Sequence, residues 1–219
     1  GTLIKRQIYL IYYINFIVDN CVNVKFNKKY FVIFSQPLMN TSKQNKYFID
    51  LIKKIETKQL NIGIIGIGYV GLPLALSFSK KGIKVIGFDN NKKVIKTLEE
   101  GRSHINHIDS KEIKRGIKSK SFLPTNNFSL IKNLDVIFIC LPTPLNKQRE
   151  PDLSFITQTI SLIRDFFKKG QLISIESTTY PGATYEIIRP LIEFNNLQIG
   201  DNFFLTYSPE RVDPGNKDF

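Results

Sequence analysis

The chain has 219 residues, of which 42% are hydrophobic and 23% are charged. This is the composition of an ordinary globular protein, and it excludes a disordered or collagen-like chain. Because Cys21 and Cys140 are its only cysteines, a disulfide framework and a cysteine metal cluster are excluded too, and a reducing, cytoplasmic setting is expected. The net charge of +12 favours an anionic partner: a nucleic acid, a membrane surface or a small anionic ligand.

The first 38 residues differ in composition from the rest of the chain. They contain neither Ala nor Glu, and an apolar run over Ile8–Val18 follows Lys5 and Arg6. This run is shorter than the about 20 residues that cross a bilayer, and no small-residue cleavage site follows it. Since the single methionine is Met39, we interpret residues 1–38 as an upstream or non-native extension; an export or anchoring segment is the alternative. The extension carries +4 of the net charge, which leaves +8 for the remainder.

After Met39, apolar residues recur at helical spacing over Tyr47–Ile55, which predicts a leading helix within residues 39–59. Short apolar runs, typical of strands buried on both faces, follow at Leu60–Ile65, Ile83–Phe88, Asp135–Leu141, Leu172–Ile175 and Phe203–Tyr207. Helical patterns lie between them at Leu72–Lys81, Lys92–Glu100, Leu153–Lys169 and Thr184–Phe194. The polar segment Ser103–Asn127 is expected to hold a helix and loops. Strands that alternate with helices predict an α/β fold built on a doubly wound parallel sheet.

A glycine-rich hexamer, Gly66-Ile67-Gly68-Tyr69-Val70-Gly71, lies between the first predicted strand and the next helix. Alone, such a hexamer fits many ordinary turns, so its surroundings decide its meaning. Here Gly66 permits a tight turn, Gly68 lets the main chain approach a pyrophosphate, and Gly71 lets the helix pack closely on the strand. The start of the helix then offers free N–H groups and a positive dipole end to the phosphates.

Asp89 ends the second predicted strand, eighteen residues after Gly71. In this position a carboxylate accepts hydrogen bonds from the adenosine ribose and repels the extra 2′-phosphate of NADP. The alternative role of Asp89 is to cap the next helix. The order of strand, glycine turn, helix, strand and acid predicts NAD binding by a Rossmann-like, doubly wound parallel sheet with helices on both faces.

Later segments extend the pattern beyond a general dinucleotide fold. They are Ile64 to Ala75 around the glycine turn, Cys140-Leu141-Pro142-Thr143-Pro144, Arg149-Glu150-Pro151-Asp152-Leu153, Glu176-Ser177-Thr178-Thr179-Tyr180-Pro181-Gly182, and Ser208-Pro209-Glu210-Arg211-Val212-Asp213-Pro214-Gly215-Asn216. In this order they resemble the nucleotide-sugar 6-dehydrogenases, the UDP-glucose and UDP-N-acetylhexosamine dehydrogenase family. The last two segments are most similar to the branch that acts on UDP-N-acetylglucosamine. UDP-glucose and UDP-N-acetylmannosamine 6-dehydrogenases are the alternatives.

The resemblance implies an oxidoreductase that converts the sugar C6 alcohol to a carboxylate with two NAD molecules, through a cysteine-bound intermediate, for surface polysaccharide biosynthesis. The cofactor-binding residues that it implies are Gly66, Gly68, Tyr69, Val70, Gly71, Asp89, Thr143 and Thr178. It also implies catalytic roles for Thr178, which positions water and cofactor, and for Glu210, a general acid/base. Arg211 is expected to bind an anionic part of the substrate or to form a surface ion pair. Val94 stands where many members carry a basic residue.

The expected nucleophile is not identified in this sequence. Cys140 ends a buried apolar run and does not match the family's nucleophile, so we expect a small core residue there. In the family, the nucleophilic cysteine and the UDP-binding half follow a segment like Ser208–Asn216, whereas this sequence stops at Phe219. We therefore expect residues 60–219 to be the NAD-binding domain of a larger enzyme, truncated before the central helix and UDP-binding domain, and expect the 219-residue chain itself to be inactive.

The expected partners are a UDP-sugar and, for the full-length enzyme, a second copy in a homodimer. A nucleic acid is not expected, because a nucleic-acid binder would cluster its Lys and Arg on one face with interleaved aromatic residues, whereas here the basic residues are spread over predicted helix surfaces. A membrane is not expected either, and the positive charge suits the pyrophosphates of NAD and of a UDP-sugar. No metal is expected, because His104 and His107 have no acidic or cysteine partner at ligand spacing. A stand-alone NAD-binding regulatory module is the alternative outside the enzyme class.

Overall fold

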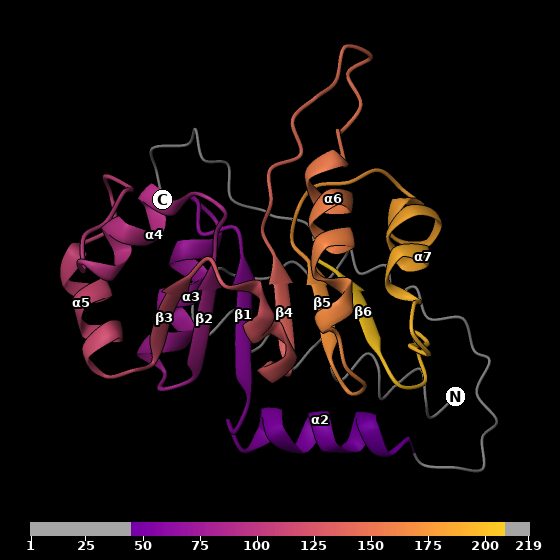
Figure 1. Cartoon of the computed structure of the whole chain (residues 1–219), viewed down its shortest axis with the longest axis horizontal. Helices are drawn as coiled ribbons and strands as arrows, with labels where there is room; N and C mark the ends of the chain where they lie inside the picture. The colour runs from indigo at the N-terminus through magenta and orange to yellow at the C-terminus, as the bar shows by residue number, and fades with distance from the viewer. Residues whose placement is uncertain (1–44, 209–219) are drawn as a thin grey trace, which may run out of the picture.

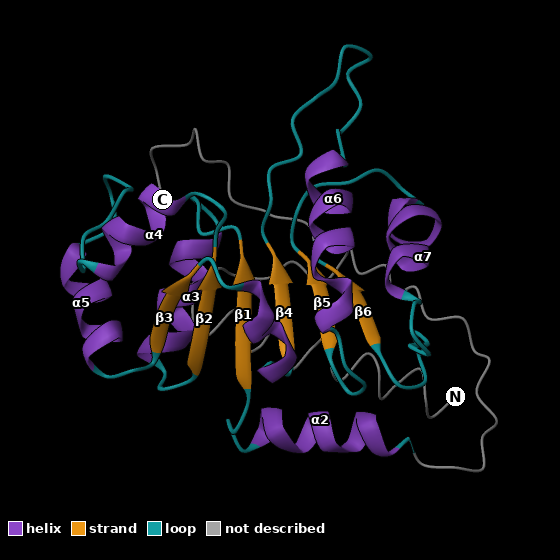
Figure 2. Ribbon diagram, viewed as in Figure 1, coloured by secondary structure: helices purple, strands orange, loops and turns teal. Residues whose placement is uncertain are grey.

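A six-stranded sheet forms the centre of the computed structural model, which describes residues 45–208. The strands are β1 (Asn61–Ile65), β2 (Lys84–Phe88), β3 (Phe122–Thr125), β4 (Val136–Ile139), β5 (Leu172–Ile175) and β6 (Phe204–Tyr207). Their spatial order is β3-β2-β1-β4-β5-β6, and each neighbouring pair is parallel. Figure 2 shows the arrowheads all pointing to the same edge. Because the order reverses between β1 and β4, the sheet is doubly wound, which confirms the predicted Rossmann-like α/β fold.

The helices cover both faces of the sheet. They are α3 (Gly71–Lys80), α4 (Lys92–Glu99), α5 (Ser110–Lys118), α6 (Ser154–Ile163) and α7 (Arg189–Ile192). Along β4, Val136 and Phe138 belong to a core with α3, α4 and α5, whereas Ile137 and Ile139 belong to a second core with α6 and α7. Since successive strand residues point to opposite faces, a continuous apolar run is what two such cores require.

The leading helix α2 (Lys46–Glu56) lies across the amino ends of the strands, below the sheet in Figure 1. Its buried side chains, Leu51 and Ile55, join the core on the α3 face. Lys54 Nζ lies 3.0 Å from Oδ1 of Asp135, the residue before β4. An apolar face and an ion pair therefore hold α2 against the amino edge of the sheet, opposite the carboxyl ends of the strands.

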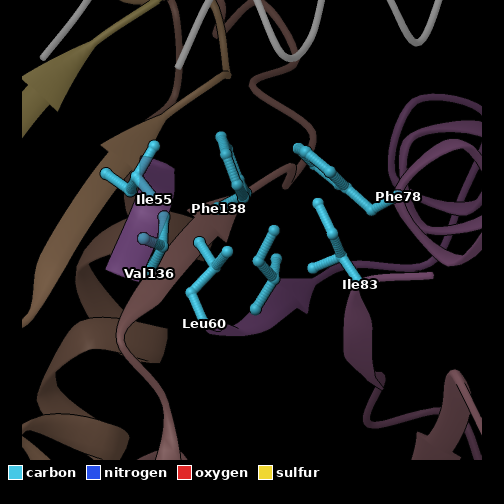
Figure 3. A pocket seen from close by; sticks show the side chains of 7 residues that line it. Ile55, Leu60, Phe78, Ile83, Val136 and Phe138 are labelled. Carbon is cyan, nitrogen blue, oxygen red and sulfur yellow. The ribbon is translucent and has the colours of Figure 1, made fainter. Parts of the chain in front are cut away.

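A small apolar cavity of about 10 Å³ lies between α2 and the α3 face of the sheet, and Figure 3 shows the side chains around it. Its lining residues are Ile55, Leu60, Ile62, Phe78, Ile83, Val136 and Phe138. These side chains offer no hydrogen-bond partner, so the cavity suits neither water nor a polar ligand. It is a packing feature of the core rather than a binding site.

The segment Ser103–Asn127 contains the edge strand β3, which its sequence pattern does not predict. The strand has only four residues, and one of them is Pro124. Proline weakens the strand signal because it lacks an N–H donor, yet an edge strand tolerates it. The helix expected in the same segment is present as α5.

Two predicted helices are shorter than their patterns suggest. The helix expected over Leu153–Lys169 is α6, which ends at Ile163 and continues as a 3₁₀ turn, because Phe167 turns back to pack its ring 5.4 Å from that of Phe203. The helix expected over Thr184–Phe194 is a π-helical turn at Thr184–Ile188 followed by α7. Pro190 lies in the first turn of α7 and cannot donate an i→i−4 bond, which accounts for the wider turn before it. None of the helices between residues 45 and 208 combines the length and hydropathy that a membrane span requires.

Candidate functional site

The glycine turn joins β1 to α3 at the carboxyl edge of the sheet (Figure 1). Gly66 has a φ of +88°, and a Cβ atom there would lie 2.5 Å from the main-chain oxygen of Cys140. A Cβ at Gly71 would lie 1.9 Å from the carbonyl oxygen of Gly66, so the start of the helix touches the end of the strand. At Gly68 a Cβ would meet no heavy atom within 4 Å. The turn is therefore tight on its inner side and open where a ligand would approach.

Tyr69 and Val70 complete the turn. Val70 precedes the first residue of α3 and makes no side-chain capping bond. Leu72 N–H donates to the Gly68 carbonyl oxygen at 3.0 Å and Pro73 has no N–H, so Gly71 is the residue of the first turn whose N–H is of the kind that binds an anion. Tyr69 is 64% exposed, and its ring stacks on that of His107 with centroids 6.0 Å apart. The exposed position of His107 agrees with a loop histidine, but the sequence gives no signal that it lies beside the glycine turn.

Asp89 is the half-buried residue that follows β2, and its carboxylate contacts the glycine turn. Oδ2 accepts a hydrogen bond from the main-chain N–H of Ile67 at 3.2 Å, and Oδ1 accepts one from Asn91 N–H at 2.9 Å. The next helix, α4, is capped by Asn91, whose Oδ1 accepts from Lys93 N–H at 3.0 Å. The alternative role of Asp89 as the cap of that helix is therefore wrong. Its carboxylate links the end of β2 to the turn after β1.

Thr143 and Thr178 lie on the loops that follow β4 and β5. Thr143 is half-buried and Thr178 is exposed. Ser177 Oγ lies 2.6 Å from the carbonyl oxygen of Leu141 and 3.1 Å from its main-chain nitrogen, so the two loops are hydrogen-bonded to each other. Cys140 N–H donates to the last residue of β1 at 2.8 Å, which places the first of these loops directly beside the glycine turn.

A hairpin follows Thr143 and projects beyond the carboxyl edge of the sheet, between β4 and α6 in Figure 1. Leu145 and Pro151 form an antiparallel bridge at its base. Asp152 then accepts a hydrogen bond from Ser154 N–H at 2.9 Å, and this main-chain donor lowers the pKa of the Asp152 carboxyl. The hairpin thus leaves from the candidate site and returns at the start of α6.

The remaining residues that the sequence singled out have plainer positions. Cys140 is half-buried and packs against the core on the α3 face, and His104 is exposed. Val94 also packs against that core, so no basic side chain stands there. Among residues 45–208, no group of three or more His, Cys, Asp or Glu residues could hold a metal ion. Glu210 and Arg211 lie outside the described residues.

Four loops therefore leave the same edge of the sheet: the glycine turn after β1, the Asp89 turn after β2, and the threonine loops after β4 and β5 (Figure 2). They surround the point between β1 and β4 where the strand order reverses. Doubly wound sheets bind dinucleotides in the crevice at this switch point. The fold and the site define a dinucleotide-binding domain.

Comparison with known proteins identifies the family. The model of the UDP-glucose/GDP-mannose dehydrogenase family, NAD binding domain, matches residues 60–218. The chain belongs to this family of nucleotide-sugar dehydrogenases, and its domain binds NAD.

Two relatives illustrate the similarity in sequence. The chain is 39% identical to the UDP-N-acetyl-D-glucosamine 6-dehydrogenase of Pseudomonas aeruginosa over 162 residues, which are 74% of this chain and 37% of that protein. It is 36% identical to the UDP-N-acetyl-D-mannosamine dehydrogenase of Pyrococcus horikoshii over 160 residues, which are 71% of this chain and 37% of that protein. The chain thus spans 37% of the length of either relative.

Solved structures agree with the sequence comparison. The UDP-N-acetyl-mannosamine dehydrogenase Cap5O of Staphylococcus aureus superposes with a TM-score of 0.66 at 32% identity, over 71% of this chain and 38% of that one. A ternary complex of GDP-mannose dehydrogenase from Pseudomonas aeruginosa also gives a TM-score of 0.66, at 28% identity, over 69% of this chain and 36% of that one.

Proposed function

We propose that the chain is the NAD-binding part of a UDP-N-acetylglucosamine 6-dehydrogenase, which oxidises the sugar C6 alcohol to a carboxylate for surface polysaccharide biosynthesis. The observation that carries this proposal is the Asp89 carboxylate held against the glycine turn at the switch point of the sheet. The 39% identity to the Pseudomonas aeruginosa enzyme supports the choice of sugar.

The residues at the carboxyl edge fit NAD. The open side of Gly68 leaves room for a pyrophosphate, with Gly66, Tyr69, Val70 and Gly71 around it. Asp89 would accept hydrogen bonds from the adenosine ribose, and its negative charge would disfavour the 2′-phosphate of NADP. Bound NAD supplies a hydride acceptor for the sugar carbon.

Thr143 and Thr178 belong to the nicotinamide side of the proposed site, because their loops follow strands on the other side of the switch point from Asp89. The exposed hydroxyl of Thr178 would position water next to the cofactor. Glu210 would act as the general acid/base on the hydrolytic step. A carboxyl group transfers protons most efficiently when its pKa lies near the working pH of the enzyme.

We further propose that the 219-residue chain binds NAD without turning over UDP-sugars. Cys140 is half-buried and packs against the core, which suits a structural cysteine rather than a nucleophile. The family resemblance supports a homodimer for the full-length enzyme, and the low cysteine content supports a cytoplasmic location. An assay of the full-length enzyme with UDP-N-acetylglucosamine, UDP-N-acetylmannosamine and UDP-glucose separates the possible substrates.

Calorimetric titration of the chain with NAD and NADP tests the cofactor site. Asp89→Asn removes the charge but keeps the size of the side chain, and it should weaken NAD binding about tenfold and narrow the preference for NAD over NADP. Asp50→Asn is the matched control, because Asp50 is an exposed residue of α2 at the opposite edge of the sheet. An unchanged preference in Asp89→Asn, or rapid NADH production by the 219-residue chain, would contradict the proposal.

A further inference from the structure

Ser177 is buried, with 6% of its surface exposed, and its hydroxyl forms hydrogen bonds with both main-chain groups of Leu141. The 2.6 Å distance joins Ser177 Oγ to the Leu141 carbonyl oxygen, and the 3.1 Å distance joins it to the Leu141 nitrogen. A serine hydroxyl has one proton to give, so it donates to the carbonyl while it accepts from the N–H. One side chain therefore fixes one residue of the neighbouring loop on both sides.

The position of Ser177 explains why a side chain, rather than the main chain, forms these hydrogen bonds. The last main-chain bond between the two strand ends is from Glu176 N–H to the carbonyl oxygen of Ile139, at 2.9 Å. Beyond this bond the loop after β4 runs out into the hairpin, while the loop after β5 turns toward α7 (Figure 1). The Ser177 hydroxyl continues the pairing by one further step, at the point where the main chains separate.

A second contact holds the same loop from its other side. The main-chain N–H of Thr179 donates to the Tyr207 hydroxyl at 3.2 Å, and Tyr207 is the last residue of β6. Thr178 thus lies between Ser177, which is bonded to the loop after β4, and Thr179, which is bonded to β6. Thr143 lies two residues after Leu141, so it is constrained by the Ser177 contact as well.

We propose that Ser177 is a positioning residue for the nicotinamide end of the NAD site, where it sets Thr143 and Thr178 in one fixed arrangement. This inference rests on the proposed function. The adenosine end is held by the glycine turn and Asp89, which follow β1 and β2. The Asp89 carboxylate accepts its hydrogen bonds from Ile67 and Asn91, whereas Ser177 and Tyr207 bond to Leu141 and Thr179. Loss of the Ser177 hydroxyl should therefore affect the nicotinamide end and leave the adenosine end as it is.

The test compares two ligands, NAD and ADP-ribose, which lacks the nicotinamide ring. In calorimetric titrations of the 219-residue chain, Ser177→Ala should weaken NAD binding about tenfold, the size of one lost hydrogen bond, and should leave ADP-ribose binding within about twofold. Ser121→Ala is the matched control, because Ser121 is also a buried serine, bonded through its Oγ to Ser79 Oγ at 2.7 Å beside β3. A purely structural serine lowers the melting temperature without changing the ratio of the two affinities.

A second variant keeps the inference testable if Ser177→Ala does not fold. Tyr207→Phe removes only the hydroxyl that accepts from Thr179, and it should lower the NAD to ADP-ribose affinity ratio in the same direction. A ratio that neither variant changes overturns the inference. So does an unmutated chain that binds both ligands equally, because the threonine loops then make no use of the nicotinamide ring. An unmutated chain that binds neither ligand overturns the proposed function itself.

Discussion

A methyl group added to the glycine turn should have opposite effects on folding at two neighbouring positions, Gly71 and Gly68. At Gly71 the new Cβ would lie 1.9 Å from the carbonyl oxygen of Gly66 and 3.1 Å from Cγ2 of Ile64. Cβ atoms in proteins essentially never come closer than 3.0 Å to such a neighbour. The first turn of α3 must therefore move away from β1 by about 1 Å before Gly71→Ala can be accommodated.

The cost of Gly71→Ala follows from what the methyl group meets. Overpacking of a well-packed core costs about 1–3 kcal/mol, and a backbone carbonyl cannot rotate aside as a flexible side chain does, so we expect about 3 kcal/mol. For a domain of this size each kcal/mol lowers the melting temperature by about 2–4 °C, which gives a decrease of about 6–12 °C. NAD binding should weaken too, because the displaced turn no longer presents its N–H groups correctly.

Gly68→Ala adds the same methyl group where no heavy atom lies within 4 Å and where φ is not in the left-handed region. The unfolded chain loses conformational freedom, so the variant should be more stable than the unmutated chain by about 0.4–1 kcal/mol. The methyl group nevertheless occupies the space through which a pyrophosphate approaches, so NAD binding should weaken by about tenfold or more.

Urea unfolding and NAD titration of both variants together check this reasoning. The expected result is a loss of stability in Gly71→Ala, a small gain in Gly68→Ala, and weaker NAD binding in both. Gly68→Ala that binds NAD as tightly as the unmutated chain would refute the assignment of its open side to the cofactor. Gly71→Ala that unfolds at the same urea concentration as the unmutated chain would refute the close helix contact.

Two further changes test the core. Lys54→Met leaves the Asp135 carboxylate without its cation and should destabilise the chain by about 1 kcal/mol at pH 7, a value reduced because the Lys54 side chain is 39% exposed. Asp135 raises the pKa of Lys54, so the difference between the two proteins in urea unfolding should be constant from about pH 7 to about pH 10.4 and vanish as the pH rises through the raised pKa; a difference that persists at higher pH argues against the ion pair. Val136→Ile places a methyl group in the cavity of Figure 3 and should raise stability by up to about 0.8 kcal/mol. A lower melting temperature for this variant would mean that the cavity is too small.

The sequence predicts the strands with continuous apolar runs well, because a strand buried on both faces needs no partner information to be recognised. It misses β3, since a four-residue edge strand that contains Pro124 carries little signal of its own. It extends α6 too far, because the turn after Ile163 depends on the contact between Phe167 and Phe203. Local patterns report local structure, whereas these errors come from contacts between distant residues.

The contacts of the candidate site likewise divide into those that the sequence indicates and those that it does not. The glycine turn and Asp89 are close in sequence and follow two strands in succession, so their spacing alone indicates a shared role. The contact between Ser177 and Leu141 joins residues 36 positions apart, and the stacking of Tyr69 on His107 likewise joins separate loops. No spacing rule connects these residues, because what brings them together is the order of the strands.

That order also predicts that the two ends of the proposed cofactor site respond separately to mutation. The loops of the proposed adenosine end follow β1 and β2, and those of the proposed nicotinamide end follow β4 and β5. The two groups of strands meet in the β1–β4 pair, which runs from Ile62 opposite Val136 to Ile65 opposite Ile139. At the amino edge α2 contacts both groups, through the ion pair of Lys54 with Asp135 and through its buried face. A lost hydroxyl at Ser177 should therefore loosen one end of the proposed site while this shared framework keeps the other end in place.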